Sequence, residues 1–200
     1  MAAKTDLVKA DKAYYAARAA PQLQRFGPIR YLTLEGKGEP GGEKFVQATQ
    51  ALYPLAYGLK KLYKQQDQDF AVPSLEGLWW VDGNQPALQV PRGRWKWKLM
   101  IRMPDFVVKK TVETAKTAVA AAKKNELVRI VAFETIEEGQ CVQAMHIGPY
   151  SQEPATIASL LRFVSEKGLE ISGLHHEIYM SDPRKVSPEK LKTIIRYPVS

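Results

Sequence analysis

The pattern Lys-x-x-Ile-Arg-x-Pro occurs twice in this sequence, in Lys98-Leu99-Met100-Ile101-Arg102-Met103-Pro104 and in Lys192-Thr193-Ile194-Ile195-Arg196-Tyr197-Pro198. Upstream of each copy, a Gly-Leu pair precedes two bulky residues, in Gly77-Leu78-Trp79-Trp80 and Gly173-Leu174-His175-His176. Further back, a predicted strand ends in glycine and Glu-Pro follows it, with Gly36 before Glu39-Pro40 and Gly148 before Glu153-Pro154. Three matches in the same order indicate an internal repeat.

Each copy of the repeat predicts a strand, a turn, a helix and two further strands. We place the first copy at about 29–104, a connecting helix at about 105–125 and the second copy at about 129–199. Each copy is too small to bury its sheet alone, so we expect the two to share a core within a single domain spanning 1–200. The predicted fold is α+β, with antiparallel sheets, helices on one face and a ligand groove where the copies meet.

Several local elements are predicted less directly, from periodicity and from Gly and Pro. Residues 21–28 are expected to form a loop, and Pro54 is expected to kink or divide a helix over Glu43–Gln66. Strands are predicted at 77–81 and 95–103, with a polar loop between them. A hairpin of 129–135 and 140–147 is expected to turn at Glu137-Glu138-Gly139.

Composition and charge indicate a globular, cytoplasmic protein. Lys and Arg number 29 against 21 Asp and Glu, a net charge of +8, and the basic residues are spread along the chain. One local run, at 107–124, is expected to be the solvated side of a helix. No aromatic residues interleave with it, so we expect no specific nucleic-acid binding. The first six residues lack a signal-peptide hydrophobic region, and no apolar run is long enough for a membrane span, so no membrane association is expected.

Metal and cofactor chemistry are not predicted. The single cysteine, Cys141, lies in an apolar-alternating run and is expected to be a partly buried structural thiol rather than a nucleophile. His175 and His176 are adjacent on a predicted strand, so their side chains point to opposite faces and cannot easily chelate one ion. The Gly-rich stretches match neither a P-loop nor a dinucleotide-binding fingerprint.

The predicted strand at 174–180 carries the sharpest functional signal. Alternation places three side chains on each face: His175, Glu177 and Tyr179 on one, and His176, Ile178 and Met180 on the other. Because apolar residues suit a helix-covered face, we expect Ile178 to face the helices and Glu177 to face the opposite side. A glutamate on a central strand is costly unless it is paired. Glu177 therefore either lines a pocket or forms an ion pair with Arg196 or Lys192 on the next strand.

Aromatic residues accumulate where a pocket between the copies would lie. They are Trp79, Trp80, Trp95, Trp97, Tyr150 and Tyr179. Trp80 is expected to fill the core. For Trp95 and Trp97 two roles fit equally well: stacking on a ligand, or packing in the core. His146 is either a polar contact in the pocket or a structural residue at a strand end.

These stretches together resemble the GyrI-like small-molecule-binding family, and most of all its stand-alone members. The resemblance covers about Ala10–Ser200 and rests on His146-Ile147-Gly148-Pro149-Tyr150, Glu153-Pro154-Ala155-Thr156-Ile157, His175-His176-Glu177-Ile178-Tyr179, Ser181-Asp182-Pro183-Arg184, Leu75-Glu76-Gly77-Leu78-Trp79-Trp80, Trp95-Lys96-Trp97 and Met100-Ile101-Arg102-Met103-Pro104-Asp105-Phe106. No helix-turn-helix region precedes the domain, so we expect a stand-alone protein rather than a complete transcription regulator.

The resemblance implies a tandem SHS2-type fold that binds hydrophobic planar or cationic small molecules. Glu177 matches the pocket glutamate of the family's drug-sensing members. Some stand-alone members are implied to hydrolyse the cyclopropane of DNA-alkylating natural products, thereby protecting the cell. On that reading the candidate catalytic residues are Glu177, as general base, and Tyr179. The candidate ligand-binding residues are Trp79, Trp95, Trp97, His146, Tyr150 and His175. The alternative is a non-enzymatic module that sequesters drugs or inhibits a protein partner, as a gyrase inhibitor would.

Overall fold

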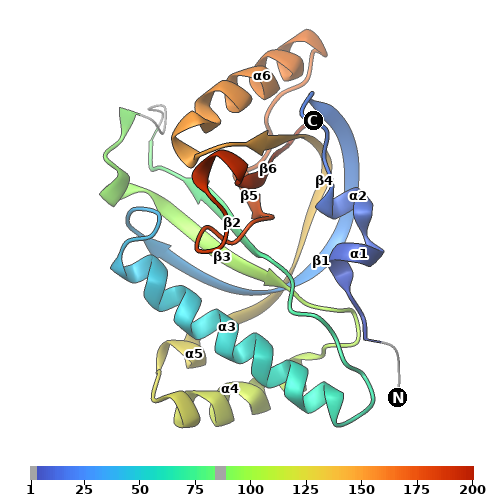
Figure 1. The fold of residues 1–200 in the computed structure, drawn as a ribbon, viewed down its shortest axis with the longest axis vertical. Coiled ribbons are helices and arrows are strands. Elements are labelled where there is room, and N and C mark those ends of the chain that lie inside the picture. Colours follow the sequence, from blue (N-terminus) through green and yellow to red (C-terminus); the bar gives the residue numbers. More distant parts are fainter. Residues whose placement is uncertain (1–3, 84–88) are drawn as a thin grey trace. The chain divides into compact units, whose positions relative to one another are not determined.

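The computed structural model describes residues 4–83 and 89–200, and these fall into two compact units (Figure 1). Unit 1 comprises Met1–Ala10, Ile29–Pro73 and Trp79–Ile136, and unit 2 comprises Asp11–Pro28, Ser74–Leu78 and Glu137–Ser200, in each case as far as the residues are described. Residues 84–88 of the predicted polar loop and the first three residues of the N-terminal stretch lie outside the described residues.

Helices and strands are mixed along the chain. The helices are α1 (Leu7–Ala10), α2 (Lys12–Tyr15), α3 (Glu43–Lys64), α4 (Lys109–Lys123), α5 (Leu127–Ile130) and α6 (Glu153–Glu166). The strands are β1 (Gln22–Lys37), β2 (Leu75–Trp80), β3 (Lys96–Arg102), β4 (Ala132–Ile147), β5 (His175–Tyr179) and β6 (Lys192–Pro198). The described strands follow one another in the order β1-β3-β2-β5-β6-β4 as a closed barrel. Mixed helix and sheet confirms the predicted α+β class.

Unit 1 is built around helix α3, which packs beside α4 and α5 (Figure 1). Its buried residues recur at helical spacing and form one apolar stripe: Ala48, Ala51, Leu52, Leu55, Ala56, Leu59 and Tyr63. Pro54 lies inside this helix and does not divide it, because α3 runs from Glu43 to Lys64 without a break; of the two predicted outcomes, a kink or a division, the division is wrong.

Unit 2 places helices on both faces of β4 and β6. Helix α6 covers one face through Leu160 and Val164, which pack against Ala144 and Ile195. Helix α2 lies on the other face, where Tyr14 contacts the strands. The sequence predicted helices on one face only, whereas α6 and α2 lie on opposite faces of these strands.

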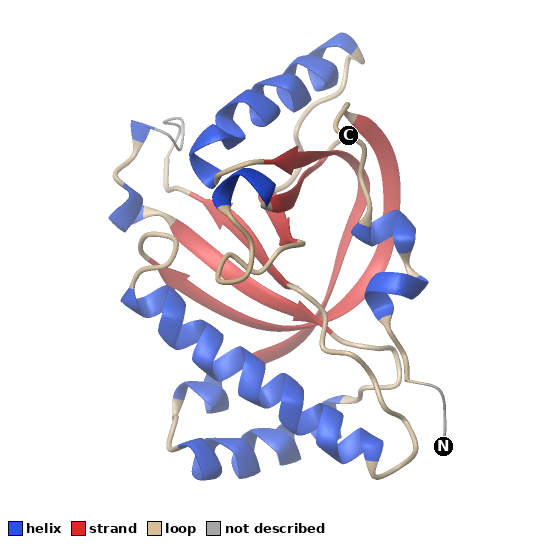
Figure 2. Cartoon of the chain, viewed as in Figure 1, coloured by secondary structure: helices blue, strands red, loops and turns tan. Residues whose placement is uncertain are grey.

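Two segments that the sequence predicted to be a turn and a loop are parts of continuous strands. The expected hairpin at 129–147 is wrong, because β4 runs continuously from Ala132 to Ile147 (Figure 2). Gly139, which the sequence predicted to lie in the turn, has a positive φ of 65° within the strand. Glycine adopts this conformation at low cost because it has no Cβ. The expected loop at 21–28 is wrong as well, because β1 begins at Gln22 and continues through Pro28.

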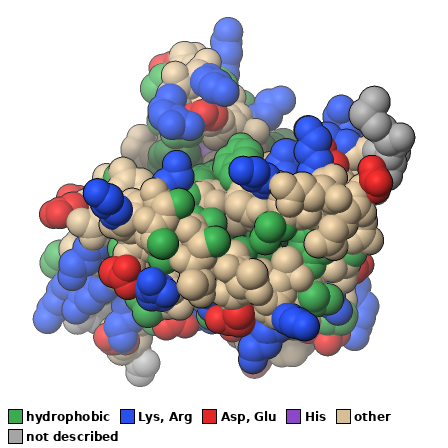
Figure 3. All heavy atoms as spheres, turned by 90° about the horizontal axis from the view of Figure 1, so that it is seen from below, with side chains coloured by type: hydrophobic (Ala, Val, Ile, Leu, Met, Phe, Trp, Pro, Cys, Tyr) green, Lys and Arg blue, Asp and Glu red, His purple; other side chains and the backbone are tan. Residues whose placement is uncertain are grey.

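Basic side chains are dispersed. Lys and Arg are interspersed with Asp and Glu on the face shown in Figure 3, and several are paired, for example Lys96 with Asp82 at 2.7 Å and Arg129 with Glu126 at 2.7 Å. In the described part of the chain, no helix is long and apolar enough to span a membrane.

A tryptophan ring of β3 packs directly against a glycine of β1, which has no side chain in its way. Gly36 pairs with Trp97 in the antiparallel register, and a Cβ added at Gly36 would lie only 2.1 Å from the Trp97 ring. Trp97 is 1% exposed and cannot turn aside into solvent. A methyl group here would therefore displace a packed indole.

We expect Gly36→Ala to lower the free energy of unfolding by about 1–3 kcal/mol, the usual effect of overpacking a core. The matched control is Gly27→Ala in the same strand, where an added Cβ meets nothing within 4 Å. Denaturant unfolding followed by tryptophan fluorescence measures both. Equal stabilities for the two variants would show that Trp97 does not constrain Gly36.

Candidate functional site

Strand β5 presents its side chains to two different surroundings. His176 and Ile178 are buried, whereas His175, Glu177 and Tyr179 are half-buried, which confirms the predicted alternation. The predicted assignment of the faces is wrong, however. Glu177 lies opposite Ile195 in the register, and Ile195 belongs to the core beneath α6. Glu177 therefore shares the α6-covered face, because α6 covers β4 and β6 while β5 lies beside them.

Glu177 is held by a histidine of its own strand. Its Oε1 lies 2.7 Å from His175 Nε2, and His175 Nδ1 lies 2.6 Å from the hydroxyl of Tyr197. The side chains of Glu177 and His175 are 13% and 15% exposed, so both are accessible only at an edge. Burial, followed by the charge of Glu177, raises the pKa of Tyr197, which stays protonated.

Two tyrosines lie close to this group. The Tyr150 and Tyr179 rings meet edge to face with centroids 6.1 Å apart. Burial, followed by the charges of Glu153, Glu177 and Asp182, raises the pKa of Tyr150 to about 12. Tyr150 thus lies in an environment of negative charge. Four residues predicted for the site, the two tyrosines with His175 and Glu177, are brought together in unit 2.

The alternative ion pair for Glu177 is not formed. Arg196 pairs with His176 in the register and points to the opposite face, where it binds Glu138. Lys192 lies at the exposed end of β6, opposite Ile147.

His146 is buried and lines a cleft in unit 2. Its Nδ1 is 2.9 Å from the hydroxyl of Thr156, and its Nε2 is 3.2 Å from the carbonyl oxygen of Pro149. The cleft has a volume of about 640 Å³ and is lined by Ala19, Met145, His146, Ile147, Ser151, Gln152, Pro154, Ala155 and Thr156. Both ring nitrogens of His146 are therefore engaged by the protein, as in a structural histidine.

The predicted tryptophans form an aromatic cluster in unit 1 with Phe45. Phe45 stacks on Trp79, with centroids 6.0 Å apart and ring planes 15° apart, and meets the edge of Trp97 at 5.9 Å. Trp79 and Trp97 are buried, and Trp95 is half-buried, with its indole nitrogen donating to the carbonyl oxygen of Val90 at 3.0 Å. Trp80, expected in the core, is half-buried.

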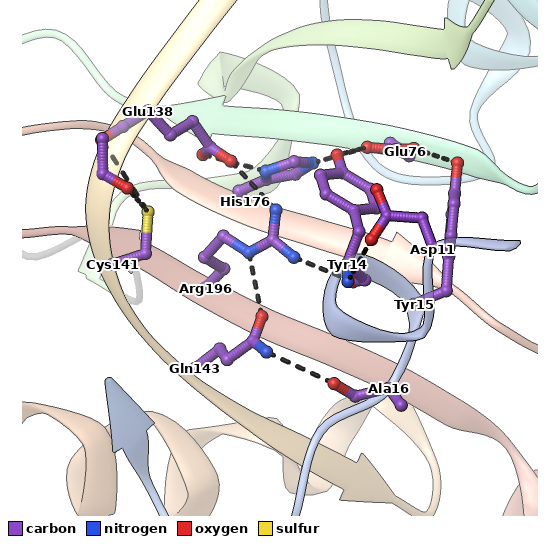
Figure 4. A network of polar contacts seen from close by, with 11 residues as sticks. Asp11, Tyr14, Tyr15, Ala16, Glu76, Glu138, Cys141, Gln143, His176 and Arg196 are labelled. Carbon is purple, nitrogen blue, oxygen red and sulfur yellow. Dashed lines mark hydrogen bonds and ion pairs between the residues drawn. The ribbon is translucent and has the colours of Figure 1, made fainter. Parts of the chain in front are cut away.

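The other face of β5 carries a buried ion network that the sequence did not reveal (Figure 4). His176 Nδ1 lies 2.9 Å from Glu138 Oε1, and His176 Nε2 lies 3.1 Å from Glu76 Oε2. Arg196 donates to the second oxygen of Glu138 at 3.0 Å and stacks over the ring of Tyr14, 4.3 Å from its centroid. His176, Arg196 and Glu76 are each 1% exposed or less.

Helix α2 and Gln143 complete this network. Tyr14 and Tyr15 both donate hydrogen bonds from their hydroxyl groups to Glu76. Arg196 also donates to the carbonyl oxygen of Tyr14 and to Gln143 Oε1, each at 3.0 Å. Two carboxylates, one guanidinium and one imidazolium balance in charge, so each buried charge has an opposite charge beside it.

The charge state of His176 follows from its neighbours. Burial lowers its pKa, but the charge of Glu138 and its hydrogen bond, followed by those of Glu76, raise the pKa of His176 to about 9. Burial raises the pKa of Glu138, but the same pairing with His176, followed by that with Arg196, lowers it to about 2. Both ring nitrogens of His176 face carboxylate oxygens, which accept only, so the ring is an imidazolium.

Cys141 lies close to the same network. It is fully buried, whereas the sequence predicted a partly buried thiol, and burial followed by the charge of Glu138 raises the pKa of its thiol to about 12. The thiol is therefore protonated and unreactive.

Comparisons with known proteins agree on one family. The model of the GyrI-like small molecule binding domain matches residues 20–200. An uncharacterized conserved protein from Listeria innocua is 40% identical with a TM-score of 0.92, covering 98% of this chain and 100% of that one. A protein named as a hydrolase from the same organism is 39% identical with a TM-score of 0.88, covering 98% and 100%. The EcmrR C-terminal domain (15% identity, TM-score 0.57, covering 90% and 96%) shares only the fold. No curated protein matches the sequence.

The buried imidazolium predicts how stability depends on pH. Folding raises the His176 pKa from 6.5 to about 9, so its contribution is complete below pH 6.5 and is lost as the pH rises through 9. Folding lowers the Glu138 pKa from 4.5 to about 2, so that contribution is complete above pH 4.5 and is lost as the pH falls through 2. We expect the free energy of unfolding, measured by denaturant titration, to fall between pH 6.5 and 9.

The control for this prediction is a pair of neighbouring substitutions. Glu138→Gln removes the charge that chiefly raises the His176 pKa, so the alkaline fall should become shallower. Glu137→Gln makes the same chemical change at the exposed next residue and should leave the profile unchanged. A parent protein whose stability is constant from pH 6.5 to 9 would rule out an imidazolium at His176.

Proposed function

This chain belongs to the GyrI-like family of small-molecule-binding domains, and we propose that it binds bulky planar hydrophobic or cationic molecules at the Glu177 side of β5. The observation that carries the proposal is the Glu177 carboxylate, 13% exposed, held by His175 and lying in unit 2 with the Tyr150–Tyr179 pair. A carboxylate beside aromatic rings favours a ligand that is both apolar and positively charged.

Negative charge in this part of unit 2 supports a cationic ligand. The charges of Glu153, Glu177 and Asp182 all act on Tyr150. Thr193 adds an unused polar group, since its hydroxyl is buried without a hydrogen-bond partner among the described residues. Thr193 lies opposite both Tyr179 and His146 in the register, on the Glu177 face. A ligand that hydrogen-bonds this hydroxyl would remove a desolvation cost.

The wider site is proposed from the sequence. The internal repeat supports a tandem SHS2-type fold with a ligand groove, and the family resemblance supports Trp79, Trp95 and Trp97 as its aromatic contacts. Tryptophan faces would supply much of the affinity for planar molecules.

Hydrolysis is the more specific form of this proposal, and relatives from Listeria innocua named as hydrolases support it. In the reaction that we propose, Glu177 takes a proton from water as the water oxygen bonds to a cyclopropane carbon. The ring carbon–carbon bond breaks, and its electron pair passes to the electron-accepting remainder of the compound, which then takes up a proton. The products are the ring-opened alcohol and a regenerated carboxylate.

Glu177→Gln separates catalysis from binding. Glutamine keeps the size of the side chain but has neither charge nor basicity. We expect hydrolysis of a cyclopropane-bearing DNA-alkylating compound to fall by about two to four orders of magnitude, the usual contribution of a general base. Affinity for a neutral planar compound should change little. The measurements are product formation by chromatography and ligand binding by fluorescence.

Glu166→Gln is the matched control, because it makes the same change at an exposed position of α6 in the same unit. It should behave as the parent protein. Unchanged hydrolysis by Glu177→Gln would eliminate Glu177 as the base. A parent protein that binds the planar cation ethidium without hydrolysing the cyclopropane compound would instead identify a sequestering protein.

A further inference from the structure

Three side chains on the α6-covered face of β5 and β6 form a chain of hydrogen bonds that ends at Glu177. The hydroxyl oxygen of Tyr197 lies 2.6 Å from His175 Nδ1, and His175 Nε2 lies 2.7 Å from Glu177 Oε1. The rings of His175 and Tyr197 also meet edge to face, with centroids 5.0 Å apart. All three side chains are only partly exposed, so water competes weakly for these hydrogen bonds.

The hydrogen bonds have one consistent direction. A carboxylate only accepts, so the proton between His175 and Glu177 is on Nε2 of the imidazole. In the neutral ring, Nδ1 is then an acceptor, and Tyr197 must be its donor. The hydroxyl of Tyr197 keeps the proton that it donates, because burial and the charge of Glu177 raise its pKa. The direction therefore runs from Tyr197 through His175 to Glu177.

We propose that Tyr197 is the positioning residue of the Glu177 site: its hydroxyl donates to Nδ1 and so, together with the Glu177 carboxylate at Nε2, fixes His175 in the Nε2–H tautomer, and that tautomer holds the carboxylate for the ligand. The inference rests on the proposed function, since it assigns Tyr197 a part in the same site. Without the hydroxyl, Nδ1 lacks a donor and can itself take the proton. Nε2 then turns a lone pair toward the Glu177 carboxylate, and two acceptors repel one another.

The ring of Tyr197 has a separate structural role. It packs against the core cluster beneath α6, which includes Val142, Leu160 and Ile195. Tyr197→Phe keeps this packing and removes only the hydroxyl. The substitution therefore tests the hydrogen bond with little change to the core.

Nitrogen-15 NMR of the side chains reads out the proposed role directly, because the chain has only three histidines. In the parent protein at pH 7, we expect His175 to be the neutral Nε2–H tautomer. In Tyr197→Phe, we expect a mixture of tautomers at His175 and an unchanged His146. Affinity for ethidium, measured by fluorescence, should fall roughly tenfold, as for the loss of one hydrogen bond to a charged group.

Tyr63→Phe is the matched control. It removes another buried hydroxyl, one that accepts a hydrogen bond from the backbone nitrogen of Val108 at 3.0 Å in unit 1. Both His175 and the ethidium affinity should be unchanged in it.

Three results would overturn the inference while ethidium binding by the parent protein still supported the proposed function. They are a doubly protonated His175 in the parent, an unchanged His175 tautomer in Tyr197→Phe, and a changed tautomer with unchanged affinity. If the parent protein binds neither ethidium nor a neutral planar compound, the proposed function itself fails. The tautomer of His175 in Tyr197→Phe then still decides whether the hydroxyl orients the imidazole.

Discussion

A buried imidazolium must be surrounded by negative charge, and in unit 2 His176 meets that requirement through side chains from separate strands. Glu138 on β4 and Glu76 on β2 accept its two hydrogen bonds, and Arg196 on β6 neutralises the second oxygen of Glu138. Unpaired charge is costly at this depth, so these strands can pair in only one register. Because side chains alternate along β5, fixing His176 on one face also fixes its neighbour Glu177 on the other.

The two faces of β5 therefore suit different tasks. On the His176 face, the charges of His176, Glu138, Glu76 and Arg196 are paired with one another and the side chains of α2 close the network, so these four groups have partners within the protein. On the Glu177 face, the carboxylate has the imidazole of His175 as partner and remains partly exposed. One strand thus carries a buried structural anchor and the carboxylate of the proposed site at successive positions, and the first supports the geometry of the second.

The sequence predicted those parts that depend on local periodicity. A period of two grouped His175, Glu177 and Tyr179, and the structure confirms their common face. It did not reveal Glu76 as a partner of His176, because the two are a hundred residues apart and no local pattern links them. Glu138 was misread as a turn residue because Glu-Glu-Gly is a turn signal, although the strand continues through it. Which face α6 covers depends on where β5 lies beside β6, and that is a tertiary property.

The central claim is that ligands meet β5 on the face of Glu177 and leave the His176 network intact. Titration with ethidium, followed by nitrogen-15 NMR of the three histidines, tests it most directly, because His175 and His176 are adjacent probes of opposite faces. The account predicts that ethidium changes the nitrogen-15 chemical shifts of His175. The chemical shifts of His176 should stay at the values of an imidazolium. A shift of His176 with His175 unchanged would place the ligand on the wrong face and contradict the account.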